Sequence, residues 1–301
     1  MSRLRVLVLG GLSVSLGFGP AVGIAGSCRP VVGYLIAHRQ RTVSRIELAE
    51  TLWADHDGDN ARRCLSTALW RLKRSTPGPT PLLTFEGPDT VSFNWNAPAW
   101  VDAIAMEMRV APLLRQKPSA LTREDLARLE RGVRLYRGDY LVGMEQEWAW
   151  IERQRLRTLY CDALYHLITA YAAGFDWSHV LEWGRQLNRE EPLREDVHRL
   201  LMAAYANTGN RASAVAQYRE CERQLARELG IEPMAETREL YQQLLFKQGS
   251  GTAPAAPPPS TISAEASRRI RRVRRVLRLS EGQLERALDS LGAGSKDSTK
   301  T

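Results

Sequence analysis

The feature that most constrains the fold is an internal repeat with a period of 34 residues in the second half of the chain. Six positions return in the same order one period later: Leu159, Asp162, Leu167 and Ala170–Ala172 align with Leu193, Asp196, Leu201 and Ala204–Ala206. This period, together with Pro192 at the point where a repeat closes, is typical of tetratricopeptide helix pairs. Such pairs bury a shared core only by stacking, and the stack leaves a surface for partners. We therefore expect an all-α repeat region in a sequence that is helical almost throughout from residue 121 to residue 248.

The first hundred residues show a different pattern, in which short strands precede and follow three helices. Alternating apolar residues on both sides of Gly10-Gly11, from Leu4 to Leu16, predict two strands joined by a tight turn. The later runs Leu82–Phe85 and Thr90–Phe93, on either side of a Gly-Pro turn, predict a hairpin. Strands, three helices and a hairpin in this order predict a winged helix.

Three helical signals lie between these strands. The first covers residues 29–39. The second begins at a capping box, Ser44–Glu47, in which the serine hydroxyl caps the helix and the glutamate carboxylate reaches back. Three residues of this helix are expected to point inward: Leu48, Leu52 and Trp53. The third helix follows an aspartate-rich loop, with Asp59 or Asn60 as the expected N-cap.

The third helix combines an apolar stripe with a strongly basic open face. Within residues 62–74 five side chains are cationic and none is acidic. The spacing of Leu65, Ala68, Leu69 and Leu72 is that of a core-facing stripe. The other face consists of Arg63, Thr67, Trp70 and Arg74, flanked by Arg62, Ser66, Arg71 and Lys73. Guanidinium groups bind phosphates or guanine edges and hydroxyls bind either, so this face suits a groove of double-stranded DNA. The plainer alternative is a solvated basic helix.

Charge and composition favour an anionic partner. The 301-residue chain has a formal net charge of +8, and residues 62–74 and residues 251–301 each hold +5, which leaves the remainder slightly acidic. The four cysteines lack the spacing of a zinc site, and no acid/base pair or P-loop is visible. We therefore expect no metal, no cofactor and no enzymatic activity.

Targeting and nucleotide-binding signals are weak. The glycines of residues 17–23 lack the long helix and the acidic residue that a dinucleotide site requires. The N-terminal apolar run alternates as strands do and lacks the continuous core of a signal peptide. No run is long and apolar enough to span a membrane, so a membrane partner is not expected and a reducing cytoplasm is the expected location.

Several motifs resemble those of the Streptomyces antibiotic regulatory protein family, in which a response-regulator-type winged helix precedes a bacterial transcriptional activator domain. The resemblance to that domain lies in three stretches: Arg194–Tyr205 with Gly209–Arg211 and Ala214, the closing signature Leu225–Pro233, and the entry Leu135–Leu141. Leu52-Trp53 and Leu69–Arg74 are similar to the family's winged helix. The sequence departs from the family in its first helix, which has few basic residues, and in its wing, which lacks the common Gly-Tyr-Arg ending.

The resemblance implies sequence-specific binding to direct repeats in promoter DNA, contact with RNA polymerase and activation of transcription. The family's polymerase-facing element is the loop before the recognition helix, here residues 54–60, with Asp55, Asp57 and Asp59 as contact candidates. The same residues are equally suited to a turn and a helix cap. Tandem DNA repeats would bring two monomers side by side.

The expected fold is mainly α with a small β component. We expect a winged helix-turn-helix DNA-binding domain at residues 1–100, an all-α tetratricopeptide-like activator domain at 101–248, a Pro/Ala/Gly linker at 249–261 and a basic amphipathic tail at 262–301. For the tail, four interpretations stay open: additional phosphate binding, folding on a partner or a second copy, an anionic membrane surface, and a solvated disordered segment.

Two other function classes compete with a DNA-binding activator. One is a helical-repeat adaptor that binds proteins and carries a degenerate winged helix. The other is a small-molecule sensor that uses an aromatic-rich concave face of the repeats.

Overall fold

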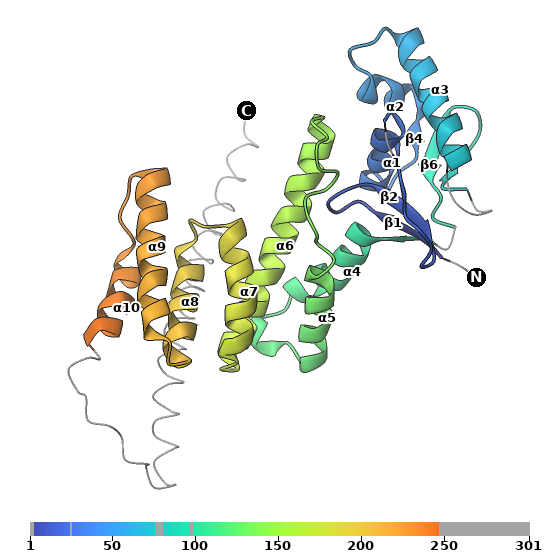
Figure 1. Ribbon diagram of the computed structural model, residues 1–301. Helices are drawn as coiled ribbons and strands as arrows, with labels where there is room; N and C mark the ends of the chain where they lie inside the picture. The colour runs from blue at the N-terminus through green and yellow to red at the C-terminus, as the bar shows by residue number, and fades with distance from the viewer. Residues whose placement is uncertain (1–2, 25, 76–80, 97–98, 247–301) are drawn as a thin grey trace, which may run out of the picture. The chain divides into compact units, whose positions relative to one another are not determined.

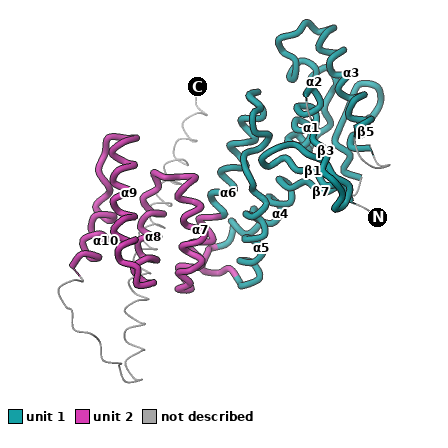
Figure 2. The backbone as a smooth tube through the Cα atoms, viewed as in Figure 1, with its two compact units in different colours: residues 1–116, 122–163 teal, residues 117–121, 164–301 magenta. Residues whose placement is uncertain are grey.

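The computed structural model describes residues 3–24, 26–75, 81–96 and 99–246 (Figure 1). They form two compact units, one made of residues 1–116 and 122–163 and the other of residues 117–121 and 164 onward (Figure 2). The predicted linker and tail, residues 249–261 and 262–301, lie outside the described residues.

The first unit begins with a four-stranded sheet in the order β3-β2-β1-β7. The predicted pair is confirmed: β1 (Leu4–Leu7) and β2 (Ser13–Leu16) are antiparallel, with Leu4 opposite Leu16. Two further strands were not predicted, β3 (Val22–Gly23) beside β2 and β7 (Ala99–Val101) parallel to β1. Both are too short for an alternating pattern to be recognised, so only their partner strands define them.

The predicted winged helix is confirmed in the same unit (Figure 1). Its helices are α1 (Cys28–Ala37), α2 (Arg45–Leu52) and α3 (Gly58–Ser75). The predicted hairpin consists of β5 (Leu83–Thr84) and β6 (Thr90–Phe93), and an unpredicted strand β4 (Val43–Ser44) pairs with β6 ahead of α2.

Two helix starts differ from the expectation. Ser44 accepts a hydrogen bond from the Glu47 amide (3.0 Å), as predicted, but the Glu47 carboxylate pairs with Arg41 and accepts a hydrogen bond from Tyr34 (2.8 Å) instead of reaching back. A hydrogen bond from a charged guanidinium to a carboxylate is stronger than one from a neutral backbone amide, so Glu47 pairs with Arg41. The third helix begins two or three residues earlier than expected, because the N-cap is Asp57, which accepts a hydrogen bond from the Asn60 amide (2.8 Å).

Buried positions agree with the expected stripes except at one residue. Leu48 and Leu52 of α2 are buried, whereas Trp53 is half-buried and ends the helix. In α3, Leu65, Ala68, Leu69 and Leu72 are all buried, as predicted.

A buried carboxylate joins the sheet to the next helix. Helix α4 (Asp102–Leu114), which was not predicted, begins directly after β7. Asp102 is fully buried and accepts the amides of Val8 (2.9 Å), Leu9 (3.2 Å) and Ala103 (2.8 Å). Burial raises the pKa of Asp102, while these amides and Arg137 oppose the rise.

The rest of the first unit consists of α5 (Arg123–Val133) and the first part of α6 (Glu147–Ala173). The short 3₁₀ helix at Pro118–Ala120, which precedes α5, belongs to the second unit. Residues 134–146 are not helical, which departs from the expectation of helix throughout. The segment of residues 137–148, which we call the strap, runs along the winged helix. Its Tyr140 hydroxyl donates to the Gly33 carbonyl in α1 (2.8 Å).

The predicted 34-residue repeat is confirmed. The later part of α6 and α7 (Trp177–Glu190) form the first period, α8 (Glu195–Asn207) and α9 (Arg211–Leu229) form the second, and α10 (Ala235–Phe246) follows them. Equivalent turns have equivalent backbones: Phe175 has φ 61° and Gly209 has φ 80°. The next residue in each repeat, Asp176 or Asn210, caps the following helix through its side chain. The period therefore includes the turn and the cap as well as the apolar positions.

Candidate nucleic-acid interface

The exposed face of α3 matches the face expected from the sequence. Its buried residues pack toward α1 and α2. All eight candidate contacts are exposed: Arg62, Arg63, Ser66, Thr67, Trp70, Arg71, Lys73 and Arg74. The structure thus brings the predicted residues together on one side of one helix.

Most of the positive charge on this face has no counter-charge nearby. Arg62 forms a salt bridge with Asp59 (2.6 Å), an exposed pair that contributes little stability. Within the described part of the chain, no carboxylate lies at salt-bridge distance from the other four cations, Arg63, Arg71, Lys73 and Arg74. Four uncompensated cations on one helix face raise the local potential and attract a polyanion.

The two hydroxyl groups of this face already donate hydrogen bonds within α3, which the sequence did not indicate. The Ser66 hydroxyl donates to the Arg62 carbonyl and the Thr67 hydroxyl to the Arg63 carbonyl, both at 2.9 Å. Arg45 of α2 also donates to the Ser66 oxygen (3.3 Å). Serine and threonine inside helices commonly bond back in this way, so their remaining capacity is that of an acceptor.

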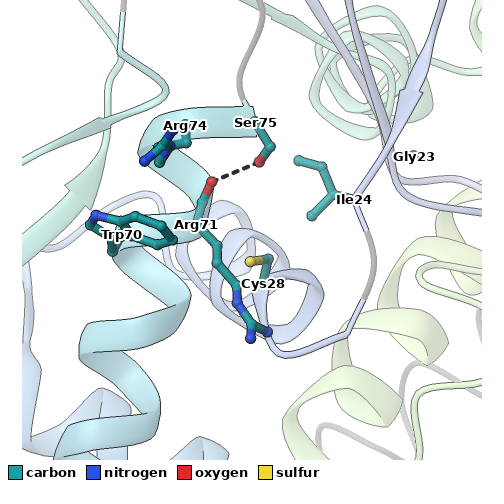
Figure 3. A pocket seen from close by; sticks show the side chains of 7 residues that line it. All are labelled: Gly23, Ile24, Cys28, Trp70, Arg71, Arg74 and Ser75. Atoms are coloured by element: carbon teal, nitrogen blue, oxygen red, sulfur yellow. Dashed lines mark hydrogen bonds between the residues drawn. The ribbon is translucent and has the colours of Figure 1, made fainter.

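A pocket of about 380 Å³ lies at the C-terminal end of α3 (Figure 3). Its lining residues are Gly23, Ile24, Cys28, Trp70, Arg71, Arg74 and Ser75. Figure 3 shows Trp70 and Arg74 together on one side, while the Arg71 side chain extends toward Cys28. The Arg74 guanidinium carbon lies 4.9 Å from the centre of the Trp70 ring. Burial raises the pKa of the Cys28 thiol, which keeps it protonated despite the nearby Arg71.

The hairpin behind α3 carries no cation. Glu86 and Asp89 are exposed at its tip, and Phe85 is half exposed. The positive surface of α3 therefore does not continue onto the wing.

The three acidic candidates of the loop before α3 have different surroundings. Asp57 caps α3 and also accepts the Asn60 side-chain amide (2.7 Å), and Asp59 pairs with Arg62. Asp55 is exposed and has no hydrogen bond or ion pair among the described residues.

Other site classes find little support in the described part of the chain. It contains no group of three or more histidine, cysteine or acidic side chains placed to hold a metal ion. No described helix is both long and apolar enough to cross a membrane. A polar cavity of about 740 Å³ in the second unit is lined by Ser178, Leu181, Glu182, Arg185, Asn188, Arg189, Leu201 and Gln217, without any aromatic residue.

Comparison with known proteins agrees with this architecture. Residues 101–245 match the family described as the bacterial transcriptional activator domain. The regulatory protein AfsR of Streptomyces coelicolor is 26% identical over 221 residues, which are 72% of this chain and 22% of AfsR. The transcriptional regulator RedD of the same organism is 26% identical over 265 residues, which are 84% of this chain and 73% of RedD.

A solved structure shares the fold. The chain of Mycobacterium tuberculosis EmbR, determined in complex with a low-affinity phosphopeptide, superposes with a TM-score of 0.65 at 22% identity. The superposition covers 89% of this chain and 69% of EmbR. The activator-domain match, the two Streptomyces regulators and the winged helix in front of the repeats confirm the resemblance of this chain to the Streptomyces antibiotic regulatory protein family.

Proposed function

We propose that this chain is a sequence-specific DNA-binding transcriptional activator that acts in the bacterial cytoplasm on promoter direct repeats. The observation that carries the proposal is the set of four uncompensated cations on the exposed face of α3. The relatives AfsR and RedD are named as regulators and not as enzymes, which supports the assignment. Residues 1–100 would supply DNA binding and residues 101–248 the activator domain.

Within α3 we assign two kinds of contact. Arg63, Thr67, Trp70 and Arg74 form the stripe that faces the groove. Three cations on its flanks are placed nearer the phosphates, Arg62, Arg71 and Lys73, and Ser66 flanks the stripe as well. Base contacts carry the sequence preference and phosphate contacts carry most of the salt-dependent affinity.

The loop before α3 is the proposed contact with RNA polymerase. Asp55 is its most available residue, because Asp57 and Asp59 already serve the helix cap and the Arg62 pair. Tandem repeats would place two copies of the chain next to each other on DNA.

The test is binding of the full chain to an operator selected from random duplexes, compared with a scrambled duplex. Arg63→Ala should weaken operator binding by about 1–3 kcal/mol and reduce the preference for operator over scrambled DNA. Arg71→Ala should weaken both duplexes similarly and flatten the log–log salt dependence by about 0.9.

Arg219→Ala is the matched control, because Arg219 is an exposed arginine on α9. It should leave both binding constants unchanged. If the two α3 variants bind as the unmodified chain does, α3 is not the DNA-binding element and the protein-binding adaptor becomes the leading alternative.

A further inference from the structure

The stripe of α3 that faces solvent has an apolar centre between its cations. Trp70 is 58% exposed and lies between Arg63 and Arg74 along this stripe. Single exposed apolar residues are common, so exposure alone decides nothing. The surroundings of this indole are more specific.

The residue one turn before Trp70 extends the apolar surface. The Thr67 hydroxyl donates to the Arg63 carbonyl (2.9 Å), so its proton is engaged within the helix. The remaining branch of Thr67 is a methyl group. A threonine methyl and an indole one turn apart, both exposed, form an apolar surface on a helix face that is otherwise cationic.

Arg74, one turn after Trp70, packs against the indole ring. Its guanidinium carbon lies 4.9 Å from the Trp70 ring centre, within the range of a cation–π contact. The stacked guanidinium keeps its planar set of five donors, and no described carboxylate pairs with it. Both side chains line the open pocket of Figure 3, so a ligand can approach them together.

The chemistry of base edges identifies what such a pair can recognise. Thymine is the base whose major-groove edge carries a methyl group, and guanine offers the two acceptors that arginine binds bidentately. Successive bases on one strand are about 3.4 Å apart, so two groups whose centres are 4.9 Å apart can reach neighbouring base pairs.

We propose that Trp70 contacts the 5-methyl group of a thymine and positions Arg74 against a guanine at the neighbouring base pair. This inference rests on the proposed DNA-binding function of α3. In this arrangement Trp70 recognises the methyl group by direct contact and also positions the Arg74 side chain.

The experiment removes single methyl groups from the DNA. Full-length chain is used to select an operator from random duplexes, and each operator thymine is replaced in turn by deoxyuridine, which lacks only the 5-methyl group. Removal of the contacted methyl group should weaken binding by about fourfold, the effect of one buried carbon. The same replacement should have no effect on Trp70→Ala, measured at the same salt concentration.

Two further variants test the arginine and the specificity of the effect. Arg74→Ala and Trp70→Ala should both lose discrimination at the guanine beside that thymine, and Trp70→Phe should restore part of it. Lys73→Ala, on the flank of the same helix, should weaken all duplexes while keeping the methyl effect. Far-UV circular dichroism checks that each variant is folded.

The outcomes separate the two proposals. If Trp70→Ala keeps the full sensitivity to deoxyuridine while binding the operator, the methyl contact is wrong and DNA binding by α3 stands. If Arg74→Ala only lowers the salt slope equally on all duplexes, Arg74 binds a phosphate and the guanine contact is wrong. If the unmodified chain selects no sequence at all, the proposed function and this inference fail together.

Discussion

At the scale of single residues, a buried chain of polar groups joins the start of α8 to the start of α10 in the second unit. Glu195, at the start of α8, accepts hydrogen bonds from the Met234 amide (2.8 Å) and the Thr237 hydroxyl (2.6 Å), and thereby holds the start of α10. Thr237 in turn accepts a hydrogen bond from Arg199 (2.9 Å), and its side chain is fully buried. Each polar group in this chain gives its neighbour a hydrogen-bond partner that the neighbour would otherwise lack in a buried position.

Thr237→Val should therefore destabilise the protein although it preserves shape. The substitution leaves a buried guanidinium and a buried carboxylate each short of one hydrogen bond, at a cost of about 1–3 kcal/mol in the free energy of unfolding. Urea denaturation followed by circular dichroism measures this loss. Thr237→Ser keeps the hydroxyl and should cost clearly less, and a valine variant as stable as the serine variant would contradict the role given to this network.

At the scale of elements, the strap of residues 137–148 completes the winged helix. The Leu9–Tyr140 bridge and the Leu141 amide, which donates to the Val8 carbonyl (3.0 Å), pair the strap with the two residues that directly follow β1. Gln146 donates to the Leu52 carbonyl at the end of α2 (3.1 Å). A Cβ on Gly33 would lie 2.2 Å from a Leu141 methyl carbon, so the absence of a side chain in α1 lets the strap approach. The strap is thus part of the packing of α1 and α2.

Tyr140→Phe is expected to loosen this attachment. Tyr140 is fully buried, and without its hydroxyl the Gly33 carbonyl loses the donor at 2.8 Å. The expected cost is about 1–2 kcal/mol in the free energy of unfolding of the first unit, measured by urea denaturation. Val142→Ala is a suitable control in the same strap, because this side chain is half exposed and should change stability by less than about 0.5 kcal/mol. Equal effects of the two substitutions would show that the buried hydroxyl contributes nothing.

At the scale of the whole molecule, the compact unit that contains the winged helix is larger than the winged helix itself. It includes residues 122–163 as well as residues 1–116. A charge network of Arg39, Glu107, Arg155 and Glu152 connects the turn after α1 with α4 and α6 within it, and its charges alternate in sign. Glu107 thus compensates two arginines from different parts of the chain, one in that turn and one in α6.

A fragment of residues 1–100 should consequently be much less stable than one of residues 1–163. The shorter fragment lacks Asp102, which accepts the Val8 and Leu9 amides, and the strap that covers α1. We expect a cooperative thermal unfolding transition for the longer fragment, and a broad or absent transition for the shorter one, in circular dichroism and calorimetry. DNA binding by the winged helix is therefore best measured on residues 1–163 or on the full chain. Equal melting temperatures of the two fragments would refute the larger unit.

Much of the architecture follows from local sequence patterns. The α3 stripe of Leu65, Ala68, Leu69 and Leu72 was predictable because helical burial depends on spacing along one element. The 34-residue repeat was predictable because each period contains the same helices, turn and cap, as Phe175–Asp176 and Gly209–Asn210 show. The exposed cations of the candidate interface belong to this class, since they lie opposite the buried stripe.

The features that the sequence did not indicate depend on partners far along the chain. Strand β7 is three residues long and is defined by its pairing with β1, more than ninety positions earlier. The same holds for the strap on α1, with Tyr140 and Gly33 separated by 107 residues. The orientation of the Thr67 hydroxyl and the stacking of Arg74 on Trp70 were also not predictable, because each depends on a choice among side-chain rotamers.

The sequence by itself therefore determined which helix presents the cations, that the second half repeats, and that strands precede and follow the first helices. Tertiary structure alone decided that Asp102 and the strap complete the winged helix, and that Glu195 and Thr237 join α8 to α10. The physical reason is that periodicity records which face of one element is buried, whereas a buried hydrogen bond needs a particular partner that only the folded chain brings within reach.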